Sequence, residues 1–378
     1  MPDCFKKLKT KKKYKAFKKM FQPVVNSSDQ VTPLISKGNR DLEMTFQDQL
    51  AALVLYHLEE YKSGRHLLQA LQEDNFAKSI IASTGLKRST FFEVINYRGL
   101  EQLIETFNSL YKEAASKLPD KFSGLGDLVA IDGSLIDATL SMHWADYRKH
   151  SNKAKTHMGF DINRGIPKNL YISDGKADER PYVGKILEPG QTGIMDRYYQ
   201  YHKNFDTWQG ECKHFVCRIK TKTTKTLLIT NEIKAGSIVF YDAVVLLGTP
   251  GATQTEKPVR VVGYKVRGVE YWIATDRFDL TAEEIAQIYK LRWDIEIFFG
   301  WWKNHLKVYH IIARSKYGLM VQIFSGLITY LLLAIYCRDE YNEEVSIKRV
   351  RELRFQIRNE FSSNDDDIDD DSLKKSDT

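Results

Sequence analysis

Cysteine is scarce in this chain and follows no recognisable pattern. Four cysteines occur among 378 residues, and no two have the C-x-x-C spacing; they lie at positions 4, 212, 217 and 337. This excludes a disulfide-rich secreted scaffold and favours free thiols in a reducing compartment. A zinc site of Cys212, Cys217, His202 and His214 is also disfavoured, because their spacing fits no standard zinc finger.

Long apolar runs are equally rare. The lysine-rich start is not followed by an apolar stretch, so we expect no secretory signal. The one membrane candidate covers residues 321–337, about 17 residues that include Gln322 and Ser325, which is at the lower limit for a span. We therefore expect a buried core helix, no membrane partner and a cytoplasmic location.

Charge is unevenly distributed along the chain. The net charge is +7, but residues 1–20 carry +8 and residues 365–378 carry −5, which leaves the remainder at +4. A hydrophobic content of 43% and an aromatic content of 12% are typical of a globular chain of two or three domains. The basic excess suggests a polyanionic partner.

The lysine-rich segment at residues 5–21 has phenylalanines and a tyrosine between its lysines. Such an arm can contact the phosphate backbone of a nucleic acid and stack on bases, but it can equally be a solubilising tail. Helical spacing of leucines follows at residues 45–71.

Residues 75–98 have the outline of two helices joined by a turn. Residues 76–82 are periodically apolar, Thr84-Gly85-Leu86 interrupts them, and Thr90 with Glu93 has the spacing of a capping box. A DNA-binding helix-turn-helix has this outline, with Lys87, Arg88 and Arg98 available for phosphates. An ordinary helical hairpin has the same pattern, so both interpretations stay open.

The pattern changes from helices to strands near Gly124. A short strand at 127–132 is expected to end at Asp132, and strands at 156–161 and 169–172 would complete a three-stranded meander. A helix over 178–188, a second strand ending at Asp196, and a strand over 214–219 follow. Residues 221–280 are rich in strands, at 237–245, 258–265 and 269–275, and are expected to be an insertion.

Residues 289–303 are predicted to form one amphipathic helix. At about 100° per residue, Tyr289, Arg292, Glu296 and Lys303 fall within roughly 60° of one another, opposite an apolar face. Trp293 lies at the polar edge. The alternative is an ordinary surface helix in which Arg292 and Glu296 form an i,i+4 ion pair.

Three carboxylates, Asp132, Asp196 and Glu296, are the candidate catalytic and metal-binding residues. Carboxylates that converge from different elements suit Mg²⁺ or Mn²⁺, and two such ions about 4 Å apart would serve phosphodiester chemistry. Arg292 and Lys303 could hold flanking phosphates, and Tyr289 could donate a further hydrogen bond. Other aspartates, at positions 137, 146, 161 and 174, are expected to lie in turns or on the surface.

The spacing Y-x2-R-x3-E-x6-K, met by Tyr289, Arg292, Glu296 and Lys303, resembles the signature of bacterial insertion-sequence transposases of the insertion-sequence-4 family, which belongs to the DDE group. Asp132 in VAIDGS and Asp196 in IMDRYY resemble the first and second catalytic aspartates of that family. The resemblance covers about residues 40–340.

The resemblance implies an α/β protein with an RNase H-like core, a β-rich insertion and a helical N-terminal DNA-binding region. The lysine-rich arm and the acidic tail are not part of the family pattern. With these two ends added, the chain divides into a basic arm (1–22), a helical DNA-binding region (23–122), the first part of the core (123–220), the insertion (221–280), the second part of the core (281–345), and a C-terminal helix with an acidic disordered tail (346–378).

The same resemblance implies Mg²⁺-dependent cleavage of double-stranded DNA at terminal inverted repeats and joining to target DNA, by a homodimer or larger synaptic complex at the bacterial nucleoid. Arg197 is expected to contact DNA, and Trp272 and Trp293 could either hold a flipped base or pack in the core. The alternatives are a metal nuclease that does not join strands and a catalytically silent DNA-binding protein.

Overall fold

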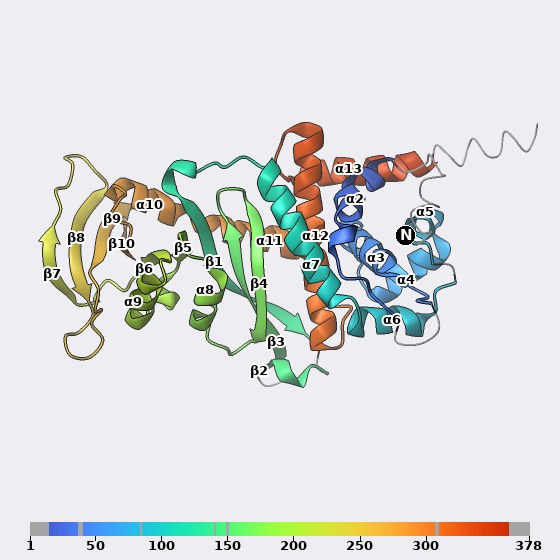
Figure 1. Cartoon of the computed structure of the whole chain (residues 1–378), viewed down its shortest axis with the longest axis horizontal. Helices are drawn as coiled ribbons and strands as arrows, with labels where there is room; N and C mark the ends of the chain where they lie inside the picture. The colour runs from blue at the N-terminus through green and yellow to red at the C-terminus, as the bar shows by residue number, and fades with distance from the viewer. Residues whose placement is uncertain are drawn as a thin grey trace, which may run out of the picture.

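A computed structural model describes residues 15–36, 41–83, 85–139, 141–148, 151–306 and 310–362. Figure 1 shows an elongated molecule in which a large sheet forms one half and a group of helices forms the other. The glutamate-bearing helix α11 (Trp293–His305) lies between the two halves and connects them through α12 (Lys316–Tyr341).

The helical half is built around α12. The helices that contact it are α2 (Lys15–Asn26), α3 (Phe46–Leu58), α6 (Arg88–Tyr97) and α7 (Leu100–Lys117). The short helices α4 (Gly64–Glu73) and α5 (Asn75–Ile80) complete this half, and α13 (Ile347–Ser362) packs on α2. By length and composition α12 could cross a membrane, but 89% of its most apolar window is buried inside the protein, as expected of a core helix.

Helix α2 includes the second half of the predicted basic arm. Its apolar side chains, among them Phe17, Met20 and Phe21, are buried in the core, so these aromatic rings support the fold and are not available to stack on bases. The first half of the arm, residues 1–14, and the acidic tail from residue 363 lie outside the described residues, as does Thr84 in the predicted turn.

The two helices around that turn are α5 and α6, and Gly85 in the turn has a φ of +69°. The predicted capping box is wrong. Helix α6 begins at Arg88 after Lys87, so Thr90 already lies inside the helix. Its hydroxyl instead donates a hydrogen bond of 2.9 Å to the Glu43 carboxylate, a contact between distant segments that local spacing does not reveal.

The core of the sheet has the RNase H-like topology. A meander of β1 (Asp127–Ala138), β3 (Ser151–Asp161) and β4 (Ile166–Asp174) is antiparallel, and β5 (Gln191–Met195) and β6 (His214–Arg218) add to β1 in parallel. The spatial order is therefore β4-β3-β1-β5-β6. The short β2 (Asp146–Arg148) pairs with the first residues of β3. Helix α8 (Arg180–Ile186) leads from β4 of the meander to β5, and α9 (His202–Gly210) leads from β5 to β6.

The β-rich segment extends this sheet. Strand β10 (Val269–Thr275) pairs antiparallel with β6, and β9 (Val259–Val266), β8 (Val239–Leu247) and β7 (Lys225–Thr230) follow in order to the far edge. Strand β7 ends the sheet with exposed Leu227, Leu228 and Ile229. The chain then returns to the core through α10 (Ala282–Leu291) and α11, so the segment is inserted between two parts of one core.

Candidate active site

Asp132 and Asp196 lie just beyond the paired ends of two neighbouring parallel strands. The pairing of β1 with β5 ends at Ala130 and Ile194, and β5 itself ends at Met195, so Asp196 follows that strand directly. The two carboxylates are close enough for the charge of Asp196 to raise the pKa of Asp132. The sequence placed Asp132 at the end of its strand; in the structure β1 continues for six residues to Ala138, paired with β3, after its pairing with β5 has ended.

The Asp132 side chain is half-buried and lies among other acids. Its pKa is raised from 3.8 to about 7: burial is the largest cause, the negative charges of Glu179 and Asp196 act in the same direction, and the Gly133 N–H and Arg292 act in the opposite direction. The Gly133 N–H donates to Asp132 at 2.8 Å. A carboxyl with neighbours of the same sign ionises readily only when a cation compensates the charge.

Glu179 is a fourth acid at this centre that the sequence did not identify. One oxygen lies 3.1 Å from Lys155 Nζ, and the other accepts a 2.8 Å hydrogen bond from the buried Tyr199 hydroxyl. Burial raises the pKa of Tyr199, as do the charges of Glu179, Asp132 and Asp196. An ideal Cβ on Gly133 would lie 2.5 Å from the Glu179 carboxyl group, so glycine is needed for this close approach.

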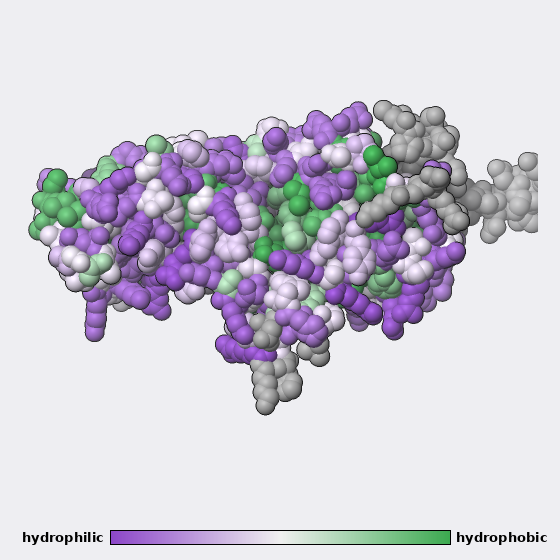
Figure 2. All heavy atoms as spheres, turned by 60° about the horizontal axis from the view of Figure 1, so that its bottom comes forward, coloured by the Kyte–Doolittle hydropathy of each residue, from purple (hydrophilic) through white to green (hydrophobic). Residues whose placement is uncertain are grey.

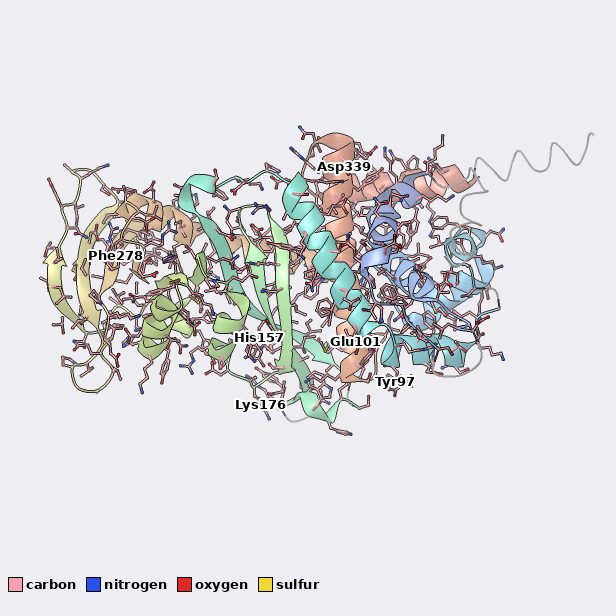
Figure 3. The ribbon with its side chains drawn as sticks, viewed as in Figure 1. Tyr97, Glu101, His157, Lys176, Phe278 and Asp339 are labelled. Carbon is pink, nitrogen blue, oxygen red and sulfur yellow. The ribbon has the colours of Figure 1, made fainter. Side chains whose placement is uncertain are left out.

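No sequence signal distinguished Glu179 from other acids. It directly precedes α8, and an acidic residue at the start of a helix is an ordinary stabilising feature. Its position becomes informative only when β3 brings Lys155 beside it. His157, labelled in Figure 3, marks the position on β3 that pairs with Gly133.

Glu296 lies on α11, which begins one residue after Arg292. The prediction of one helix over 289–303 is therefore wrong in detail, because α10 ends at Leu291 and α11 starts at Trp293. This break places Glu296 in the first turn of α11, where the helix dipole favours a negative charge. Arg292 donates to Glu296 Oε1 at 2.6 Å, which is the i,i+4 pair expected of an ordinary helix.

Arg292 has a second electrostatic partner in Asp132. This guanidinium therefore connects the glutamate helix with the first aspartate, and the Arg292–Glu296 pair is more than a surface ion pair. The apolar face of α11 was predicted correctly: Ile295, Phe298 and Trp302 are buried.

Lys303 attaches the far end of α11 to β1. Its ammonium donates to the Ser134 hydroxyl and, at 3.3 Å, to the Leu135 carbonyl. Ser134 lies two residues beyond Asp132 on the same strand, so Lys303 lies near the centre through a part of β1 that the sequence expected to be absent. Its contact with a DNA phosphate stays a prediction.

The three aromatic candidates, Trp293, Tyr289 and Trp272, have different surroundings. Trp293 is 58% exposed, and Tyr289 is buried beside Arg292. Trp272 on β10 has the Lys225 ammonium 4.4 Å from the centre of its ring. It lines a cavity of about 240 Å³ together with Arg197, which follows Asp196 directly.

The donor chemistry of the centre fits a hard divalent cation. Asp132, Asp196, Glu179 and Glu296 offer only carboxylate oxygens, and Glu296 can keep Arg292 on one oxygen while it offers the other. Within the part of the chain that the structure describes, no three histidine, cysteine or acidic side chains form a ready-made metal cluster. The sharing of ions by Asp132, Asp196 and Glu296 thus stays a prediction.

Comparison with known families gives one match to more than half of the chain. Residues 123–332 match the family described as "Transposase DDE domain". This segment begins just before β1 and ends within α12, so it contains both aspartates, the inserted strands and the glutamate helix.

Three named relatives are transposases. The chain is 30% identical over 223 residues to the transposase y4zB of Sinorhizobium fredii, covering 57% of this chain and 62% of that protein. It is 24% identical over 214 residues to the transposase for insertion sequence element IS5377 of Geobacillus stearothermophilus, covering 56% and 57%. It is 25% identical over 258 residues to the transposase for insertion sequence element IS4SA of Synechocystis sp., covering 65% and 71%. The match therefore spans less than two thirds of the first two relatives.

Among solved structures, a cryo-EM structure of the piggyBac transposase synaptic complex with hairpin DNA is similar over 92% of this chain and 80% of that chain, with a TM-score of 0.44 and 12% identity.

Proposed function

The chain belongs to the family of transposases with a DDE domain, and from this premise we propose that it catalyses cut-and-paste DNA transposition. The proposed activity is divalent-metal-dependent cleavage at the ends of an insertion sequence, followed by joining of those ends to target DNA. In the joining step a 3′-hydroxyl attacks a target phosphorus, a new P–O bond forms, and the bond to the leaving 3′-oxygen breaks.

The observation that supports this proposal is the gathering of Asp132 and Asp196 at the ends of the paired segments of two parallel strands, with Arg292 linking Asp132 to Glu296. A plain DNA-binding surface has no use for this arrangement, because acids beside phosphates repel them. Acids become useful when a cation lies between them and the phosphate.

We assign Asp132, Asp196 and Glu296 as the residues that would hold Mg²⁺ or Mn²⁺, with Glu179 beside them. Two such ions, when bound, would polarise the phosphodiester and activate a water or a 3′-hydroxyl for attack. Arg292 orients Glu296 through its 2.6 Å hydrogen bond and adds positive charge near the phosphate.

The finer assignment is to the insertion-sequence-4 family, on the signature Tyr289, Arg292, Glu296 and Lys303. In this proposal the basic members and the tyrosine contact DNA next to the cleaved bond. Support comes from the geometry around α11, where Lys303 reaches β1 beside Asp132 and Tyr289 lies against Arg292.

Two tryptophans and one arginine have proposed roles in holding DNA bases. Trp293 has the exposed ring that stacking on an extrahelical base requires. Trp272 and Arg197 line one cavity of about 240 Å³, in which a base could stack on the indole while the guanidinium contacts a phosphate.

The proposed partners are two double-stranded DNA ends and a target duplex, bound by a homodimer or larger synaptic complex at the nucleoid. The helical region at residues 23–122, which is part of the helical half, is the proposed DNA-binding region because its α5–α6 hairpin has a short glycine turn. The proposed domain limits are those derived from the sequence.

The proposal is tested on DNA that carries the inverted repeats flanking the gene. We expect Mg²⁺-dependent cleavage at the repeat ends, which is lost in Glu296→Gln although DNA binding is retained. Asp174→Asn is the matched control, because the Asp174 carboxylate accepts a backbone hydrogen bond from Lys176 in a turn. Cleavage by Glu296→Gln at the wild-type rate would remove Glu296 from the mechanism.

A metal nuclease without strand transfer is the competing function. A pre-cut repeat end with a free 3′-hydroxyl separates the two activities, since only a transposase inserts it into a plasmid. Cleavage without insertion of this end would reduce the function to that of a nuclease.

A further inference from the structure

A groove along the outer half of β1 runs from the centre toward solvent. It has a volume of about 660 Å³, within the range of ligand pockets. Gly133, Ser134 and Leu135 line it directly after Asp132, and Glu179 and Lys303 form part of its wall. The groove therefore begins at the residue after Asp132 and includes Glu179 in its wall.

Three lysines from two elements line this groove. Lys303 comes from α11, whereas Lys153 and Lys155 come from β3. Against their three positive charges stand the acids Asp137 and Glu179, so the lining has a net positive charge. Figure 2 turns the lower side of Figure 1 forward, and much of this face is hydrophilic.

The two β3 lysines are held differently. Lys155 lies 3.1 Å from Glu179 and donates to the Ala177 carbonyl at 2.9 Å, so its ammonium is fixed beside the centre. Lys153 pairs with Asp137 at 2.7 Å, with side chains that are 30% and 64% exposed. An exposed pair of this kind contributes little stability, so another anion can replace Asp137 at low cost.

The length of the groove suits a strand of nucleic acid. Five residues separate Asp132 from Asp137 on β1, which corresponds to about 17 Å at 3.3–3.4 Å per residue. One strand of duplex DNA covers that distance in about five nucleotides, at 3.4 Å each. A strand cut at the centre would therefore pass Lys155 first and reach Lys153 a few nucleotides away.

We propose that this groove binds the phosphate backbone of the DNA strand next to the cleaved bond, with Lys153 and Lys155 as phosphate contacts in addition to Lys303. The inference rests on the proposed function. In the free protein Asp137 pairs with Lys153. When DNA binds, a phosphate takes the place of Asp137 beside Lys153.

The test uses the two halves of one ion pair. Lys153→Met and Asp137→Asn break the same contact, so a purely structural pair would give both variants the same effect. If a phosphate binds there, the effects have opposite signs: Lys153→Met weakens DNA binding, and Asp137→Asn strengthens it because a competing acid is gone.

The probe is a fluorescent 30-base-pair duplex, with binding followed by anisotropy from 50 to 200 mM salt in EDTA. Loss of one phosphate contact lowers the slope of log K against log salt by about 0.9. We expect this change in Lys153→Met and an unchanged slope with tighter binding in Asp137→Asn.

A control pair lies on α13, outside the proposed DNA-binding region and away from β1 in Figure 1. Lys348 and Glu352 form an exposed ion pair of 3.9 Å on this helix. Lys348→Met and Glu352→Gln are expected to leave both affinity and slope near wild type.

Each outcome has one meaning. If the wild type binds and cleaves DNA but the Lys153 and Asp137 variants change affinity alike or not at all, the groove assignment is wrong and the proposed function stands. If the wild type neither binds nor cleaves DNA that carries its repeats, the proposed function falls, and the groove assignment falls with it.

Discussion

Replacing Asp132 by asparagine should remove one defined part of the pH dependence of stability. In the metal-free protein the pKa of Asp132 is raised from 3.8 to about 7, first by burial and then by Glu179 and Asp196. The folded state therefore holds a proton on Asp132 at pH values where the unfolded chain has released it. Stability falls as pH rises from about 4 to about 7 and then stays level.

The size of this effect follows from the shift. A change of about three pH units corresponds to at most about 4 kcal/mol, at 1.36 kcal/mol per unit. Asp132→Asn carries no charge at any pH in this range. In EDTA its free energy of unfolding should match wild type more closely at pH 5 and exceed it by up to that amount at pH 8.

The assay is urea unfolding at pH 5 and pH 8 in EDTA for wild type, Asp132→Asn and Asp137→Asn. Other buried acids also titrate, but the difference between variant and wild type cancels their contribution. Asp137 is the control because it is an exposed carboxylate on the same strand. Equal pH dependence in wild type and Asp132→Asn would refute the electrostatic description of the centre.

Three further substitutions test other contacts. Gly133→Ala should cost about 1–3 kcal/mol in urea unfolding, since its Cβ would lie 2.5 Å from the Glu179 carboxyl group. In a Glu179→Ala background the same substitution should cost little, and an undiminished cost there would contradict the clash. Arg260→Met should lower the free energy of unfolding by about 3–5 kcal/mol, because it leaves the buried Asp242 carboxylate without the guanidinium that lies 2.7 Å away. Thermal or urea unfolding measures this loss, and a loss under about 1 kcal/mol would show that the pair is dispensable. Trp293→Ala should change stability by less than about 0.5 kcal/mol but weaken cleavage, measured as the rate on a repeat-end duplex; wild-type cleavage would end its proposed role.

The sequence was most informative where local pattern and chemistry coincide. Alternating and continuous apolar runs located the core strands, and the apolar residues around Phe298 located the buried face of α11. Asp132 and Asp196 were identified because each ends or follows a short apolar run, and the structure places both just beyond the paired ends of two parallel strands.

Long-range contacts account for what the sequence did not reveal. The length of β1 beyond Asp132 depends on pairing with β3, and no local signal encodes that partner. Glu179 has meaning only beside Tyr199 and Lys155, which belong to other elements. The capping role expected for Thr90 failed because α6 begins two residues earlier, at Arg88, and the Thr90 hydroxyl instead contacts Glu43, far along the chain.

The central claim is that Asp132, Asp196 and Glu296 hold the same divalent ions. Fe²⁺ substituted for Mg²⁺, with ascorbate and peroxide, cuts a polypeptide backbone only close to the bound metal. The account predicts fragments that end near residues 132, 196 and 296 in one sample, all lost in Asp132→Asn and all competed by excess Mg²⁺. Cuts confined to one of these positions, or unchanged cuts in the variant, would contradict it.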